Sequence, residues 1–254
     1  MKIVVIGGTG LIGSKVVAKL NAHGHEAVAA SPNSGVNTLT GEGVDAALAG
    51  ADVVVDVSNS PSFEDKAVMD FFTTATNTLI AAERKAGVKH HVALSVVGTE
   101  RMTDSGYMRA KVAQETLITE SGIPFTIVHA TQFYEFVKSI ADAATDGDTV
   151  RLAPVFIKPM AAEDVSTAVA RAAAGEPVNG VHEVSGPEEF RLTELITRGL
   201  AARGDSRTVV DDPDARYFGA HLTDRELVPA PDAEVFPTTF EQWLSAQQAA
   251  PTGR

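Results

Sequence analysis

The chain has 254 residues, of which 44% are hydrophobic and 21% charged, with a formal net charge of −12 and no cysteine. The absence of cysteine excludes disulfides, thiolate metal sites and cysteine nucleophiles, and it favours a cytoplasmic location. The acidic charge argues against a nucleic-acid partner, and no apolar run reaches the length that a membrane span needs. We therefore expect a globular protein that acts on a small molecule.

A buried strand, a glycine-rich turn and a helix open the chain. The apolar run at residues 3–6 is followed by Gly7, Gly10 and Gly13, and then by a helical pattern. Gly7 allows a tight turn, Gly10 leaves room for a pyrophosphate, and Gly13 lets the helix pack closely on the strand. The helix N-terminus presents free N–H groups to phosphates. The turn is thus predicted to bind a dinucleotide through Gly7, Thr9, Gly10, Leu11, Ile12 and Gly13.

The second predicted strand, residues 26–30, ends in a polar turn that bears on cofactor choice. An acidic residue here would bind the 2′-hydroxyl of NAD, and none is present. Ser31 and Asn33 offer hydrogen bonds without repelling a 2′-phosphate, which favours NADP(H), with NAD(H) as the alternative. A solvated turn with no ligand also explains these polar residues.

A third predicted strand at residues 52–57 is apolar enough to be buried on both faces. Ser58 and Asn59 follow it at the carboxyl edge of the sheet, where they can contact the cofactor ribose or simply form a turn. Residues 63–86 then predict a long amphipathic helix that ends at Gly87. On the next strand, residues 90–95, two adjacent histidines point to opposite faces, so no metal site is expected.

The candidate catalytic residues lie just beyond that strand. Tyr107 and Lys111 share one face at the start of a predicted helix, 12 residues after Ser95 at the end of the strand. A nearby ammonium group lowers a phenol pKa from about 10, which would make Tyr107 an acid–base group near neutral pH. Ser95 is expected to orient a substrate oxygen, and Lys111 to bind the nicotinamide ribose. A solvated helix face is the alternative explanation for the Tyr–Lys pair.

These motifs together resemble the short-chain dehydrogenase/reductase superfamily in its extended and atypical branches. The stretches at residues 56–61, 93–98 and 107–115 resemble the NmrA-like group of NAD(P)-binding oxidoreductases. The resemblance implies that Ala130, at the end of the strand at residues 125–130, and Thr131, which follows it, lie along the nicotinamide. It also matches Asn77 to a recurring asparagine, although a buried polar helix residue explains Asn77 as well.

The aromatic residues after the fifth strand are candidates for the substrate pocket. Phe133 and Phe136 are expected either to line that pocket or to pack in the core. His129, at the end of the strand, is interpreted as a hydrogen-bonded structural histidine or a site residue.

Strands alternating with helices predict a doubly wound α/β sheet of the Rossmann type. Residues 1–150 are expected to form the NAD(P)-binding domain, and residues 151–254 a small, interwoven α/β substrate lobe whose last four residues fray. The predicted function is NADP(H)-dependent hydride transfer to a ketone, aldehyde, quinone or imine. A catalytically idle redox sensor that binds a regulatory protein and a sugar-nucleotide isomerase are the alternatives. The family resemblance also allows a homodimer.

Overall fold

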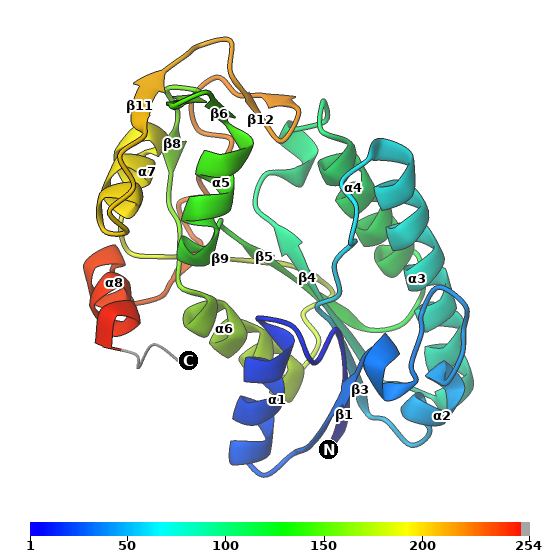
Figure 1. The fold of residues 1–254 in the computed structure, drawn as a ribbon. Helices are drawn as coiled ribbons and strands as arrows, with labels where there is room; N and C mark the ends of the chain where they lie inside the picture. Colours follow the sequence, from blue (N-terminus) through cyan, green and yellow to red (C-terminus); the bar gives the residue numbers. More distant parts are fainter. Residues whose placement is uncertain (250–254) are drawn as a thin grey trace.

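The computed structural model describes residues 1–249, so the fraying expected at residues 251–254 lies outside the described residues. Its centre is a sheet of seven parallel strands, which runs through the middle of the molecule in Figure 1. From one edge to the other the strands are β14 (Glu234–Val235), β9 (Gly180–Ser185), β5 (Phe125–Ala130), β4 (His90–Val96), β3 (Val53–Asp56), β1 (Lys2–Ile6) and β2 (Glu26–Ala30).

The order of the strands fixes where a ligand can bind. From β1 the chain moves outward to β2, then crosses back to β3 and continues through β4, β5 and β9 on the other side. The carboxyl ends of β1 and β3 therefore flank the point at which the winding reverses. In open α/β sheets ligands bind in the crevice at this point. The doubly wound sheet predicted from the sequence is confirmed.

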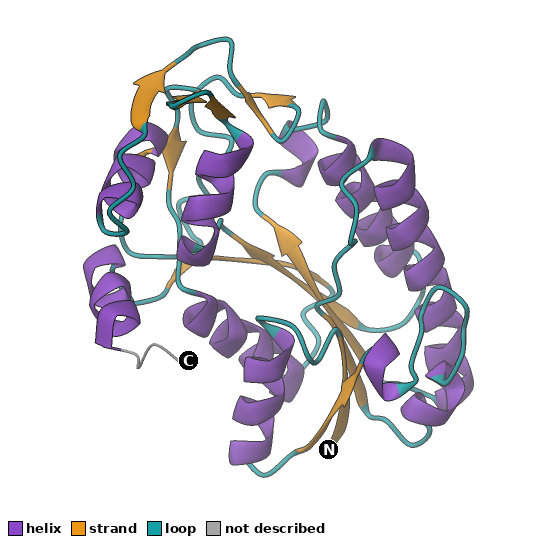
Figure 2. Ribbon diagram, viewed as in Figure 1, coloured by secondary structure: helices purple, strands orange, loops and turns teal. Residues whose placement is uncertain are grey.

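Helices cover both faces of the sheet, as the purple layers in Figure 2 show. α1 (Gly13–Ala22) and α6 (Ala162–Ala174) pack on one face. The other face carries α2 (Val44–Leu48), α3 (Asp65–Ala86) and α4 (Gly106–Thr119). Val5 packs with α1 and α6, whereas its neighbour Val4 packs with α2 and α3. Because successive strand residues point to opposite faces and helices cover both faces, the central strands β1 and β3 are largely apolar.

The long helix α3 begins two residues later than predicted. The Glu64 carboxylate accepts hydrogen bonds from the backbone N–H groups of Lys66 and Ala67, at 3.3 and 2.9 Å, and so caps the helix. Phe63 consequently lies in the loop before the helix and is exposed. The predicted stop is confirmed, since Gly87 ends the helix with a φ of +73°.

A second layer of short elements lies above the carboxyl edge of the sheet, at the top and left of Figure 1. Its apolar side chains form a separate cluster that includes Tyr134, Phe240 and Trp243. The elements of this layer are α5 (Val137–Ala143), α7 (Leu192–Ala201), α8 (Phe240–Ala249), β6 (Thr145–Asp146), β7 (Thr149–Leu152), β8 (Phe156–Ile157), β10 (Phe190–Arg191), β11 (Thr208–Asp211), β12 (Arg216–Tyr217) and β13 (Ala220–His221). In the chain as a whole, 3-10 turns lie at Pro32–Ser34, Thr99–Arg101 and Tyr134–Phe136.

The expected division at residue 150 does not coincide with a boundary between the two layers. α5 lies before this position and packs in the second cluster, whereas α6, β9 and β14 lie after it and complete the sheet layer. The chain therefore crosses between the layers several times. It returns from the second layer to the sheet so that β9 can pair with β5, and β14 with β9. Within residues 1–249, no helix is both long and apolar enough to span a bilayer.

Candidate functional site

The glycine-rich turn is closed by backbone contacts that leave no room for side chains. Gly7 has a φ of +76°, and a Cβ atom there would lie 2.9 Å from the backbone nitrogen of Ser58. A Cβ atom on Gly8 would lie 2.6 Å from Cα of Ala29, and one on Gly13 would lie 2.7 Å from Cα of Gly8. Gly10 is exposed, and its N–H donates to the Gly7 carbonyl at 3.0 Å. The turn thus lies tightly against β2 and the end of β3.

This cradle suits the pyrophosphate of a dinucleotide. The cap residue of α1, Ile12, supplies no side-chain hydrogen bond, and the first turn of the helix carries no acidic residue. The Ser14 N–H donates to the Gly10 carbonyl at 3.1 Å, and the positive dipole end of the helix faces an anion at the turn. Thr9, Gly10 and Leu11 are exposed at the turn, whereas Ile12 is buried and contributes its backbone only.

The polar turn after β2 is open on one side. Asn33 is exposed, and Ser31 is buried with its hydroxyl oxygen lacking a hydrogen-bond partner among the described residues. A buried polar group in this state gains free energy when a ligand supplies a partner. The turn holds no carboxylate that would oppose a phosphate. Its chemistry fits the adenosine ribose end of the cofactor.

Tyr107 lies at the start of α4 among aromatic rings. Its ring centroid is 5.5 Å from that of Phe63 and 5.9 Å from that of Phe72. Burial raises the pKa of the Tyr107 hydroxyl to about 12. The expectation that Lys111 lowers this pKa is wrong for this structure, because the aromatic surroundings disfavour the phenolate. The phenol is therefore protonated at neutral pH.

Lys111 lies one turn further along α4 but points into the protein. It is 2% exposed, and its Nζ donates to the Leu94 carbonyl oxygen at 2.9 Å and to the Gln114 side-chain oxygen. The Phe72 ring, which also contacts Tyr107, lies 4.5 Å from this Nζ atom. Burial lowers the pKa of Lys111 to about 8, against the attraction of Asp56 and Glu115. In this conformation Lys111 joins α4 to β4 and is not exposed to a ribose.

This buried lysine should make stability depend on pH. The folded chain releases the Lys111 proton near pH 8, whereas the unfolded chain holds it to about pH 10.5. Between these values the unfolded state binds more protons, so the free energy of unfolding should rise with pH by about 3 kcal/mol. Denaturant unfolding of wild type and Lys111→Met from pH 7 to 10.5 measures this rise, which the variant should lack. Parallel curves for the two proteins would contradict the burial of a charged Lys111.

Ser95 faces α4 and is already hydrogen-bonded. Its hydroxyl donates to the Glu115 carboxylate, and His129 Nε2 lies 3.1 Å from the same carboxylate oxygen. His129 Nδ1 lies 3.9 Å from Glu183, since Ser95, His129 and Glu183 are in register on β4, β5 and β9. Burial raises the pKa of Glu115, but its interactions with His129 and Ser95 outweigh burial and lower it overall. Ser95 can orient a substrate oxygen only by breaking its bond to Glu115.

The loop after β3 is tied to the same buried network. Asp56 accepts hydrogen bonds from the Ser58 hydroxyl at 2.6 Å and from the Gln114 amide at 3.0 Å, and Gln114 in turn binds Lys111. Asn59 is exposed and accepts a hydrogen bond from the next backbone N–H. Ser58 therefore lies beside the glycine turn, whereas the side chain of Asn59 contacts its own loop.

The residues after β5 form a wall with unpartnered polar groups. Ala130 and Thr131 are buried, and the Thr131 hydroxyl has no partner among the described residues; nor do the side-chain amide of Gln132 and the hydroxyl of Ser185 at the end of β9. These groups gather at the carboxyl edge of the sheet and can serve a polar ligand group such as a carboxamide. The rings of Phe133 and Phe136 stack 5.0 Å apart beside them, and Phe136 is exposed.

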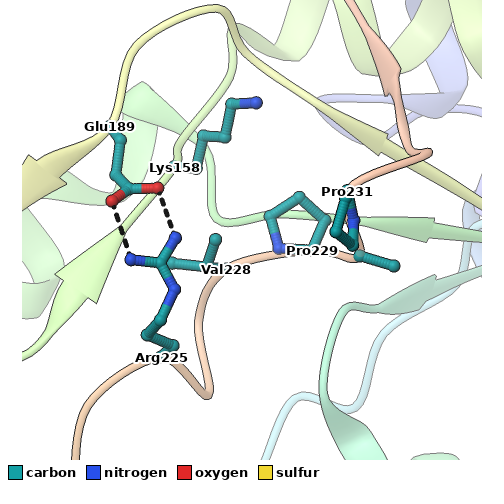
Figure 3. Close-up of a pocket in the computed structure, with 7 residues that line it drawn as sticks. Lys158, Glu189, Arg225, Val228, Pro229 and Pro231 are labelled. Atoms are coloured by element: carbon teal, nitrogen blue, oxygen red, sulfur yellow. Dashed lines mark hydrogen bonds and ion pairs between the residues drawn. The ribbon is translucent and has the colours of Figure 1, made fainter.

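A separate cavity of about 330 Å³ lies between the sheet edge and the second layer (Figure 3). Arg225 and Glu189 form a two-pronged ion pair across it, at 3.0 and 2.7 Å, and Lys158 lines the same space. The backbone N–H of Ala230 in its wall donates to Glu183 at 2.7 Å. None of the candidate catalytic residues lines this cavity.

Several residues of the buried network around Lys111 and Ser95 were not identified from the sequence. Gln114 and Glu115 follow Lys111 by about one helical turn and lie in the family-like stretch at residues 107–115, but neither signal assigned them a role in the site. Glu183 gave no sequence signal, because it is brought next to His129 only by the register of β5 and β9. Asn77 is exposed and donates to the Thr73 carbonyl at 2.8 Å, so the explanation as a buried polar residue is wrong.

The fold and the glycine turn define a dinucleotide-binding protein of the Rossmann type. A family model described as NAD(P)H-binding matches residues 7–175, which include the turn, Tyr107 and Lys111. The chain belongs to this NAD(P)H-binding family.

One curated relative and two solved structures illustrate what this chain is similar to. Photosystem II assembly factor Ycf39 of Trieres chinensis is 27% identical over 149 residues, or 53% of this chain, and the match spans about half of that relative, 47% of its length. The dTDP-glucose 4,6-dehydratase DesIV of Streptomyces venezuelae, solved with NAD, has a TM-score of 0.72 at 17% identity, covering 97% of this chain and 95% of that one. The NADPH complex of quinone oxidoreductase QOR2 from Escherichia coli has a TM-score of 0.65 at 20% identity, covering 83% and 77%. These likenesses show a shared fold.

Proposed function

We propose that this chain is an NADP(H)-dependent oxidoreductase that reduces a small carbonyl-type substrate, with Tyr107 as the proton donor. The observation that carries the proposal is the position of Tyr107 at the N-terminal end of α4, next to the carboxyl edge of the sheet and packed against Phe63. Bound NADPH would supply the hydride that adds to the carbonyl carbon. The Tyr107 hydroxyl would give its proton to the carbonyl oxygen, so that an alcohol forms.

The other residues position these groups. The glycine turn would bind the pyrophosphate, and the unpartnered groups of Thr131 and Gln132 would bind the nicotinamide end. Lys111 fixes the helix that carries Tyr107 through its bond to the Leu94 carbonyl. Ser95 acts with Glu115 as a second tie between β4 and α4. In this proposal Ser95 and Lys111 are positioning residues, unlike the direct roles expected from the sequence.

The turn after β2 supports a preference for NADPH. Replacing the exposed Asn33 with aspartate places a negative charge where the 2′-phosphate would lie, and two charges at about 4 Å interact by about 1 kcal/mol in water. We expect Asn33→Asp to weaken NADPH binding about fivefold to tenfold and to leave NADH binding unchanged or tighter, because the added carboxylate can accept a hydrogen bond from the 2′-hydroxyl of NADH. Fluorescence titration of both cofactors at low salt measures this difference. Equal losses for the two cofactors would place the 2′-phosphate elsewhere.

A panel of acceptors tests the reaction class. The purified protein is mixed with NADPH and with ketones, aldehydes, quinones and imines in turn, and absorbance of the reduced nicotinamide is followed. Acceptor-dependent oxidation supports the reductase. Tight NADPH binding with no oxidation by any acceptor would contradict it, and interconversion of a sugar nucleotide without net oxidation would indicate an isomerase.

A second candidate is a cofactor-binding protein without turnover. Lys111 and Ser95 are both committed to internal hydrogen bonds, and the curated relative is named as an assembly factor. Such a protein would use the nicotinamide to sense redox state and would bind a regulatory protein partner. The acceptor panel separates this candidate from the reductase.

A further inference from the structure

Two exposed aromatic side chains from distant parts of the chain meet beside Tyr107. Phe63, in the loop before α3, is 58% exposed, and Phe218, between β12 and β13, is 43% exposed. Their ring centroids are 6.4 Å apart, and the Phe63 ring also lies 5.5 Å from the ring of Tyr107. Large apolar rings are usually buried, so two of them exposed at one place indicate a binding surface.

The backbone at Phe218 is in a strained conformation, with a positive φ, in the turn that places its ring beside Phe63. Tyr217 pairs with Ala220, so Phe218 and Gly219 form a two-residue turn, with φ values of +46° and +90°. Positive φ at both positions favours asparagine or glycine at the first of them. A bulky residue in this region is strained, and such strain is found at ligand-binding and active sites.

The charges around the two rings are paired. Arg109 lies 2.7 Å from Asp65, and Arg216 lies 3.7 Å from Asp104. Lys66, three residues after Phe63, is paired with Asp70. These cations already have carboxylate partners, so this surface favours an uncharged ligand over a phosphate or a carboxylate.

We propose that Phe63 and Phe218 form an aromatic clamp that binds the flat face of an uncharged, conjugated ring and directs its carbonyl group towards Tyr107. The substrate class is thus a planar cyclic carbonyl compound such as a quinone or an aryl ketone. A nucleotide sugar is disfavoured, because its two phosphates would meet only arginine and lysine side chains that already have carboxylate partners. The orientation of the substrate carbonyl group towards Tyr107 rests on the proposed function. Binding of the ring by the clamp does not, because it is measured without turnover.

The probe is 1,4-naphthoquinone, which is planar and uncharged and forms no thiol adduct with a chain that has no cysteine. Its Kd is measured by calorimetry in the presence of NADP⁺, which cannot donate a hydride. Stacking on one ring contributes a factor of about 5 to 10, so Phe218→Asn should weaken binding by that factor. Unchanged binding in this variant, no binding to wild type, or tighter binding of UDP-glucose would each overturn the clamp.

Two further variants separate the ring from the fold. Asparagine suits the positive φ at position 218, so Phe218→Asn should unfold at the same temperature as wild type or higher. Phe63→Leu keeps apolar volume without the ring face and should also weaken naphthoquinone binding. Val178→Asn, at an exposed apolar position before β9, is the matched control and should bind like wild type. Clamp-dependent binding without NADPH oxidation would support the clamp and refute the reductase.

Discussion

Replacing Tyr107 with phenylalanine should lower kcat about a hundredfold to ten-thousandfold, the usual contribution of a positioned proton donor. The ring remains among Phe63 and Phe72, so neither the fold nor the Kd for NADPH should change. Steady-state rates with the best acceptor of the panel, together with a cofactor titration, measure both quantities. A variant with undiminished kcat would remove Tyr107 from the chemistry.

A matched variant and a pH profile sharpen this test. Tyr134 is a buried tyrosine whose hydroxyl donates to the Thr238 carbonyl at 3.2 Å, and Tyr134→Phe should lower stability by about 1 kcal/mol without affecting kcat. Because burial raises the pKa of Tyr107 to about 12, its phenol stays protonated from pH 7 to 10. The reduction rate should therefore show no loss of a Tyr107 proton in this range. A fall near neutral pH that is absent from Tyr107→Phe would indicate a phenol activated by Lys111.

Replacing Gly13 with alanine should weaken NADPH binding about tenfold to a hundredfold. The added methyl group would lie 2.7 Å from Cα of Gly8 and inside the van der Waals contact distance of the Gly7 carbonyl. Neither backbone atom can move without opening the turn, and strain of this kind costs about 1–3 kcal/mol. Fluorescence titration gives the Kd, and thermal unfolding with and without NADPH shows how much of the loss lies in the fold.

Gly180 provides the control for this substitution. It lies at the start of β9, and an added Cβ atom would have its nearest neighbour, the Val178 carbonyl oxygen, at 3.8 Å. Gly180→Ala should therefore bind NADPH like wild type. If Gly13→Ala also binds like wild type, the turn does not hold the pyrophosphate.

Local patterns were sufficient to predict most of the fold. The bounds of β2 and β5 match the predicted strands residue for residue, because each is a short apolar or alternating run between turn residues. The end of α3 at Gly87 followed from the glycine. The order of the strands in the sheet was not predicted, because it depends on contacts between distant segments, which local periodicity does not contain.

The sequence predicted where the candidate site residues lie better than it predicted their pKa values and hydrogen-bond partners. Spacing placed Tyr107 and Lys111 on one helix, but the pKa of the phenol depends on Phe63 and Phe72, which come from another part of the chain. The direction of Lys111 depends on the Leu94 carbonyl across the β4–α4 interface. The partner of Ser95, Glu115, likewise became visible only once β4 and α4 were packed together.

The most direct test of the central claim is a single turnover. NADPH is bound to an excess of protein and mixed rapidly with the best acceptor of the panel, and absorbance of the reduced nicotinamide is followed. The proposed function predicts that wild type oxidises all of the bound NADPH, and that Tyr107→Phe does so at least about a hundredfold more slowly with the same affinity for the cofactor. NADPH that stays bound and reduced with every acceptor would contradict it.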